Sequence, residues 1–172
     1  MSLLKVQELQ HTNGTSAMTI DTAGRVSRPN KCFFHVYIDS SGGNPGTGGT
    51  VDRVPFTAAL HNEGNHFTLD ATNPRFTAPI AGVYQFNWLL NLYNVSAGNW
   101  VRQRVYVNGG GTNQDFIITY LDYQTTDDQS LQSSFALKLN ANDYVEFITN
   151  SQVSATYSAG PTWNSVSGYL VG

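Results

Sequence analysis

The segment from Gly82 to Tyr93 constrains the fold more than any other part of the sequence, because it is apolar on both sides. Successive side chains of an extended strand point to opposite faces. One face carries five large apolar side chains, those of Tyr84, Phe86, Trp88, Leu90 and Leu92. The opposite face carries Val83, Leu89 and Tyr93. One face of a strand in a β-sandwich normally meets water, so the second apolar face indicates contact with another subunit.

The same two-residue alternation recurs along the chain, and no window of 11 or more residues carries a helical apolar stripe. Further strands are expected over residues 32–38, 56–60, 100–107, 116–121, 133–139, 144–149 and 165–171. Turns rich in Asn, Gly and Pro separate them. About ten short antiparallel strands with such turns predict an all-β sandwich or jelly roll.

The first 27 residues differ from the rest, because they contain no Phe, Trp or Tyr. A small hairpin is expected from Met18–Ile20 and Arg25–Ser27, around the turn at Asp21–Gly24. A segment this poor in apolar side chains cannot fold alone. We therefore expect a connector or stalk over residues 1–27 and a globular head over residues 28–172.

Composition and motifs exclude several classes of function. The nine Lys and Arg residues and the net charge of −3 leave no basic footprint for a nucleic acid. The chain has no apolar run near the roughly 20 residues that a bilayer-spanning helix needs, and no signal-peptide core. We therefore expect neither membrane insertion nor classical secretion. No nucleophile elbow, phosphate-binding loop or metalloprotease motif is present, and Cys32 lies in an alternating apolar strand. The sequence thus predicts a protein that is not an enzyme.

Candidate metal ligands are few. The densest acidic patch contains Asp122, Asp127 and Asp128, in a region expected to be a loop. Calcium prefers several oxygen ligands, so these aspartates are calcium candidates, although a solvated turn is the interpretation that we favour. His35, His61 and His66 have no Cys or carboxylate at a zinc-site spacing. We expect no cofactor, with calcium as the alternative.

The stretch from Phe56 to Trp88 carries a recognisable pattern. It contains Phe56, Asn62 and Phe67, then Arg75-Phe-Thr-Ala-Pro79, and finally Gly82-x-Tyr-x-Phe-x-Trp88. This order resembles the signature of the complement C1q globular-head domain, a family structurally related to tumour necrosis factor. The closing segment Val166–Val171 and the opening Arg28-Pro29 with Phe33-Phe34 are similar to the family's last and first strands. Two departures are a Phe67-to-Phe76 spacing two residues longer than usual and Trp88 in place of Phe or Tyr.

The resemblance implies a ten-stranded jelly roll over residues 28–172, assembled as a compact homotrimer that binds through outer loops or clefts between subunits. Candidates for the trimer core are Tyr84, Phe86, Trp88, Leu90 and Tyr169. The segment Asn13–Val26 is similar to short segments that precede terminal domains in bacteriophage tail-fibre proteins. The chain has no collagen-like repeat, which separates it from the vertebrate complement subgroup.

The leading hypothesis is a non-catalytic trimeric recognition head of a phage fibre, carried on the virion or extracellular after release, that binds a host-surface receptor, a glycan or a protein. The alternatives are a structural trimerisation cap of a fibre and a bacterial extracellular ligand or adhesin of the same fold. Two tryptophans beside loops rich in Asn, Gly and Ser are the binding candidates, with their neighbours: Asn99, Trp100, Thr162, Trp163 and Asn164. A plain role at the rim of the sandwich stays open for both.

Overall fold

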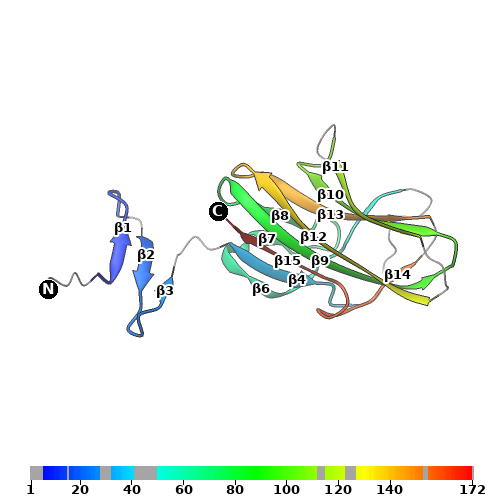
Figure 1. The fold of residues 1–172 in the computed structure, drawn as a ribbon, viewed down its shortest axis with the longest axis horizontal. Coiled ribbons are helices and arrows are strands. Elements are labelled where there is room, and N and C mark those ends of the chain that lie inside the picture. Colours follow the sequence, from blue (N-terminus) through cyan, green and yellow to red (C-terminus); the bar gives the residue numbers. More distant parts are fainter. Residues whose placement is uncertain are drawn as a thin grey trace. The chain divides into compact units, whose positions relative to one another are not determined.

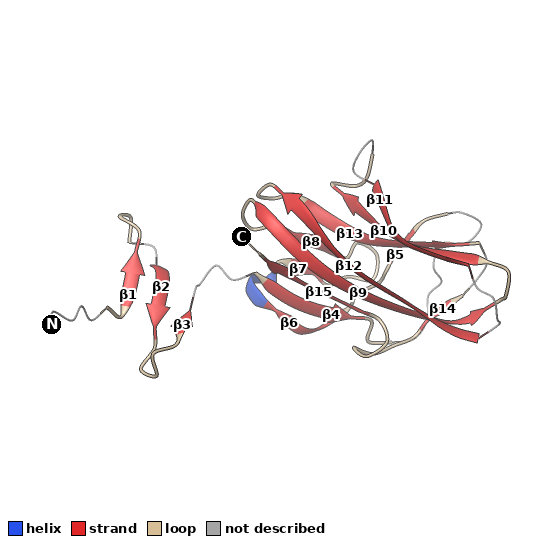
Figure 2. Cartoon of the chain, in the orientation of Figure 1, coloured by secondary structure: helices blue, strands red, loops and turns tan. Residues whose placement is uncertain are grey.

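The computed structural model describes residues 6–14, 16–27, 32–40, 50–111, 115–122, 127–152 and 155–171. It is built from antiparallel strands, and the helical structure within the described residues is one 3-10 turn, η1 (Glu63–Asn65) (Figure 2). None of the described residues forms a helix long and apolar enough to cross a membrane. The chain divides into two compact units, Met1–Lys31 and Cys32–Gly172.

The first unit is a three-stranded antiparallel sheet of β1 (Glu8–Gln10), β2 (Ser16–Ile20) and β3 (Val26–Ser27). The turn between β2 and β3 is closed by Asp21, whose carboxylate accepts hydrogen bonds from the N–H groups of Ala23 and Arg25 at 2.9 Å each. The predicted hairpin is therefore present, with β1 as an additional strand. The expected boundary between residues 27 and 28 stays a prediction, because residues 28–31 lie outside the described residues.

The second unit, the head, consists of two antiparallel sheets (Figure 1). One, the β9 sheet, contains β4 (Phe33–Tyr37), β6 (Ala58–Asn62), β9 (Gly82–Val95), β12 (Asp127–Leu139), β14 (Thr156–Tyr157) and β15 (Ser165–Leu170). Its order is β12-β9-β15-β4-β6, with β14 on β9. The other, the β10 sheet, contains β5 (Asp52–Arg53), β7 (Phe67–Thr68), β8 (Arg75–Thr77), β10 (Trp100–Val107), β11 (Asp115–Asp122) and β13 (Tyr144–Ser151). Its order is β11-β10-β13-β8-β7, with β5 on β13. The expected all-β jelly roll is confirmed.

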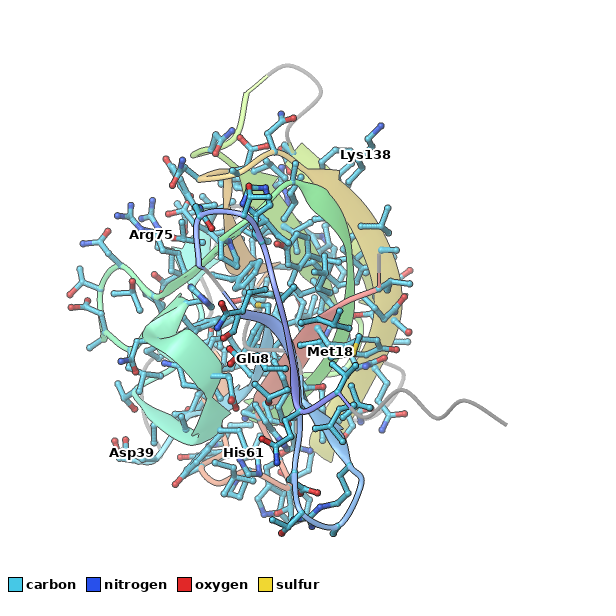
Figure 3. All side chains as sticks on the ribbon, turned by 90° about the vertical axis from the view of Figure 1, so that its left-hand side faces the viewer. Glu8, Met18, Asp39, His61, Arg75 and Lys138 are labelled. Carbon is cyan, nitrogen blue, oxygen red and sulfur yellow. The ribbon has the colours of Figure 1, made fainter. Side chains whose placement is uncertain are left out.

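Aromatic rings fill the space between the two sheets. Trp88 of β9 meets Phe147 of β13 edge to face, with ring centroids 5.4 Å apart, and Phe34 of β4 stacks on Phe76 of β8 at 5.1 Å. In β15, Gly168 lies against the Phe34 ring so closely that a Cβ there would come within 2.6 Å of two ring carbons. Charged side chains such as Arg75 and Lys138 point outward instead (Figure 3).

The structure corrects four of the five residues predicted for the trimer core. Tyr84, Phe86, Trp88 and Leu90 are at most 2% exposed within a single chain. They face the β10 sheet and belong to the head's own core, so no part of them remains for another subunit. The outer face of β9 is the one with Val83, Leu89 and Tyr93, which the alternation assigns to the subunit contact. Only the choice of these four residues for the trimer core is therefore wrong. Tyr169 is 43% exposed and lies on the outer face of the β9 sheet.

Candidate functional site

The segment between β14 and β15 holds Trp163 over the end of β9. Trp163 is 53% exposed, although tryptophan has the largest side chain, and the backbone N–H of Trp163 donates to the Gly160 carbonyl at 3.2 Å. Pairing of β14 with β9 at Thr156 and Tyr157 fixes the start of this segment. The loop therefore holds Trp163 in a defined position.

Asn164 anchors this loop and is fully buried. Its Oδ1 accepts from the Asn91 N–H at 2.8 Å, and its Nδ2 donates to the Asn91 carbonyl at 2.7 Å and to the Ser158 carbonyl at 2.5 Å. Both polar atoms of the Asn164 side chain are thus hydrogen-bonded within the chain. The sequence-based assignment of Asn164 to direct ligand contact is wrong, because the side chain points into the protein and supplies hydrogen bonds that the loop backbone needs.

A hollow of about 280 Å³ opens beside Trp163. Its lining comes from β9, from the start of β12 and from the loop: Asn91, Tyr93, Asp128, Ser158, Ala159 and Trp163. The Asn91 side chain donates to the Ser130 hydroxyl at 2.8 Å and accepts from the Ser158 hydroxyl. The floor of the hollow is therefore held by the same network that holds the loop.

Trp100 lies in a second aromatic cluster, on the β10 sheet. Its ring stacks on Tyr120 of β11 with centroids 6.1 Å apart and planes at 22°. The guanidinium of Arg102 lies 4.1 Å from the centre of the Trp100 ring and 5.0 Å from that of Tyr120. A hydrogen bond from Tyr120 to the Asp122 carboxylate raises the pKa of the Tyr120 hydroxyl. Trp100 is therefore the first residue of a strand and part of an aromatic and arginine platform, not a loop residue.

The other predicted residues are distributed around these two features. Asn99 closes the turn between β9 and β10 by donating from Nδ2 to the carbonyls of Ser96 and Ala97. Thr162 is exposed next to Trp163. The turn at residues 96–99 links the end of β9 to Trp100, and β14 pairs with β9 near that same end, at Leu92 and Tyr93 (Figure 1). Trp163 shares the lining of its hollow with Tyr93, so both tryptophans belong to this end of β9.

Three residues of the two aromatic features are not among the predicted site residues: Arg102, Tyr120 and Tyr93. Arg102 faces Tyr120 only through the pairing register of β10 with β11. Tyr93 was assigned to a subunit interface from its alternation alone. The sequence alone does not indicate which residues lie next to Arg102 or Tyr93, because their neighbours come from other strands.

The predicted calcium candidates do not form a cluster that the structure describes. Asp122 ends β11 and Asp128 belongs to β12, whereas residues 123–126 and the side chain of Asp127 lie outside the described residues. Within the part of the chain that is described, no three His, Cys, Asp or Glu side chains lie close enough to hold a metal ion. The calcium alternative stays a prediction.

The outer face of the β9 sheet has both apolar and polar parts. Phe33, Val83 and Tyr169 are 38%, 37% and 43% exposed, on the neighbouring strands β4, β9 and β15. Beside them lies a polar hollow of about 390 Å³, whose lining includes His35, Asn87, Ser134 and Ser167. His35 pairs across strands with His61, whose ring meets Phe33 with centroids 5.6 Å apart. Burial and the charge of His61 lower the pKa of His35.

Comparison with known proteins agrees with this architecture. The head is similar to the globular domain of zebrafish complement 1qA protein, at 16% identity and a TM-score of 0.61 over 83% of this chain and 98% of that chain. It is also similar to murine APRIL at pH 5.0 (12% identity, TM-score 0.60, 83% and 100% covered) and to the PRD1 vertex protein P5 (16%, 0.56, 82% and 97%). At identities this low, the structural similarity establishes a shared fold and nothing more. No curated protein matches the chain. Residues 41–171 match the C1q domain, so the chain belongs to the C1q domain family.

Proposed function

We propose that the chain is a non-catalytic, homotrimeric recognition head of a phage tail fibre or a similar virion appendage, and that it binds a receptor on the host surface. The observation that carries the proposal is the combination of an exposed apolar patch on one sheet with two aromatic features at one end of the head. The patch would join the subunits, and the aromatic features would meet the receptor.

The trimer contact is assigned to the outer face of the β9 sheet. We define the β9-sheet patch as Phe33, Val83 and Tyr169. Phe33 and Tyr169 are direct cross-strand partners, and Val83 lies on the same face one strand further. Contiguous exposed apolar surface of this kind on a soluble protein marks an interaction site. Three copies that cover this face would supply the subunit contact that the sequence pattern of β9 and the family resemblance both predict.

The receptor contact is assigned to Trp100 and Trp163. Trp, Tyr and Arg are the residue types that dominate binding energy at interfaces. In a trimer each feature occurs three times, so weak contacts would add up through avidity. The similarity to a vertex protein and the tail-fibre-like segment Asn13–Val26 support a place on a virion, or outside the cell after release.

A catalytic role receives no support from the single thiol. Cys32 is buried, and burial raises its pKa to about 11, so it is a thiol and not a thiolate at neutral pH. The function proposed here needs surfaces rather than a reactive group.

Light scattering tests the assembly. The expected mass is three times 18.8 kDa, about 56 kDa. Tyr169→Glu should give a folded monomer, whereas the matched control Ile117→Glu, at a 56% exposed position of β11, should leave the trimer intact. A parent protein that runs as a monomer at micromolar concentration would contradict the proposal.

Attachment to host cells and a glycan array test recognition. Trp100→Ala or Trp163→Ala should weaken attachment while the trimer persists, and Ile117→Ala, at an exposed position outside the predicted binding residues, serves as the control. A trimer that attaches to no cell and binds nothing on the array would favour the structural cap over the recognition head.

A further inference from the structure

We propose that the hollow beside Trp163 is a binding site for a single neutral pyranose ring. The inference rests on the proposed recognition function and names the chemistry of its ligand. It is carried by the size of the hollow, its aromatic wall, the kind of polar groups that line it, and the network that holds it in place.

The size of the hollow suits one sugar ring. Its volume is about 280 Å³. Pockets that enclose drug-sized ligands start at about 300 Å³, so this space is at the lower limit and has no room for an extended oligosaccharide. A terminal residue of a longer glycan would fit, with the remainder of the glycan in solvent.

Trp163 supplies the aromatic wall. About half of Trp163 is exposed, although burying an indole is favourable. Gly160 lies next to its ring, since a Cβ at that position would come within 3.7 Å of the indole. An exposed indole beside a polar hollow matches a pyranose, which has an apolar face of C–H groups and a rim of hydroxyls. Tyr93 adds a second aromatic ring to the lining.

The polar groups of the hollow favour hydroxyl donors. Asp128 contributes a carboxylate, which only accepts hydrogen bonds and has about four acceptor positions, so it can take sugar hydroxyls in addition to its contacts within the chain. The Ser158 hydroxyl gives its proton to Asn91 and keeps acceptor lone pairs. A ligand that brings several O–H donors therefore satisfies this lining.

The charge of the hollow disfavours acidic sugars. Its six lining residues include one carboxylate and no Lys, Arg or His. A carboxylate on the ligand would meet Asp128 without a cation between them, and like charges repel. The site should thus distinguish a neutral hexose or N-acetylhexosamine from a uronic or sialic acid.

The hollow is formed before a ligand arrives. Asn164 and Asn91 hold the loop by hydrogen bonds in the protein interior, so little conformational entropy remains to be lost on binding. The larger hollow on the outer face of the β9 sheet is a weaker candidate, because the proposed trimer contact lies on the same face. On the Trp100 platform the guanidinium of Arg102 already occupies a face of the Trp100 ring.

Ligand-observed saturation-transfer NMR on the trimer tests the proposal directly. The probes are the methyl glycosides of glucose, galactose, mannose, N-acetylglucosamine and N-acetylgalactosamine, with methyl glycosides of glucuronic acid and N-acetylneuraminic acid as acidic counterparts. At least one neutral glycoside should bind at millimolar concentration, and both acidic ones should bind at least ten-fold more weakly.

Variants of the lining locate the site. Trp163→Ala should weaken binding at least ten-fold, Trp163→Phe should restore part of it, and Asp128→Asn should raise the relative affinity of the acidic glycosides. The control Ile117→Ala, at an exposed position of β11 that does not line the hollow, should leave sugar binding unchanged. Circular dichroism and light scattering confirm that each variant remains folded and trimeric.

Several results would overturn the inference. They are the absence of binding for all five neutral glycosides, binding that survives Trp163→Ala, or a preference for the acidic sugars. If the trimer still attaches to host cells under such a result, the proposed recognition function stands and this site is wrong. If the trimer binds a neutral sugar through Trp163 but attaches to no cell, the site stands and its place in host recognition is wrong.

Discussion

Asn164→Ala tests whether a single buried amide builds the Trp163 loop. The substitution removes three hydrogen bonds, one accepted from the Asn91 N–H and two donated to the carbonyls of Asn91 and Ser158. The Asn91 carbonyl keeps a second partner, because the Ser158 N–H donates to it at 3.2 Å. Two backbone groups therefore lose the partner that Asn164 supplied, the Asn91 N–H and the Ser158 carbonyl.

The expected cost follows from these two groups. A buried polar group left without a partner costs about 1–3 kcal/mol. The Asn91 N–H is buried and should cost near the upper value, whereas Ser158 is only partly buried and water can reach it. The loss in free energy of unfolding should be about 2–4 kcal/mol. Asn164→Asp should cost at least as much, since a carboxylate can still accept from Asn91 but cannot donate, and its charge would be buried.

Denaturant unfolding measures this cost, at one fixed protomer concentration because a trimer's stability depends on concentration. Thr162→Ala, two residues away and exposed, is the control and should change stability by less than about 0.5 kcal/mol. Hydrogen exchange at Asn91 should accelerate in Asn164→Ala. A variant as stable as Thr162→Ala, with unchanged exchange, would refute the assignment of Asn164 as the anchor of the loop.

Two further predictions concern the β9 sheet. Gly168→Ala should lower the free energy of unfolding by about 1–3 kcal/mol, because its Cβ would overlap the Phe34 ring. The double variant with Phe34→Leu should lose less stability than the sum of the two single losses, and a loss equal to that sum in unfolding experiments would contradict this. Because the pKa of His35 is lowered in the folded protein, the unfolded chain protonates this imidazole more readily. The stability that the neutral His35 contributes is therefore complete above about pH 6.5, its pKa in the unfolded chain, and is lost as the pH falls through its folded pKa. His35→Asn should flatten the decline in stability measured between about pH 7 and 5, and an unchanged slope would show that His35 is not its source.

The strands were predictable where a strand's own sequence alternates. The strand expected over residues 100–107 is β10 itself. The strand expected over residues 133–139 is longer, because β12 begins at Asp127. Residues 127–132 are mostly polar, and their strand conformation comes from pairing with residues of β9 as far as Val95. Strand propensity could not reveal an extension that a distant partner imposes.

The candidate site was predictable only in part. An exposed Trp163 next to a loop rich in Gly and Ser could be inferred from composition. The opposite fates of Thr162 and Asn164, one exposed and one fully buried, could not, because they depend on which side of the loop meets β9. For the same reason the sequence identified two faces of β9 but not which of them is internal. Register and packing between distant strands decide these points, and neither is a local property.

The position of β15 has a consequence for how the head is made. It is the last of the described strands along the chain, yet it lies in the middle of its sheet, between β9 and β4. Without residues 165–170 the strands of this sheet fall into two groups that do not pair with each other, β12, β9 and β14 in one and β4 and β6 in the other. Phe34 and Phe86 then also lack the glycine that lies against their rings. Folding of the head therefore has to wait until β15 has been made, and closing contacts this distant in sequence makes it slow. A nascent chain stalled before β15 would expose unpaired strand edges, and termination there would split the sheet in two instead of trimming its border.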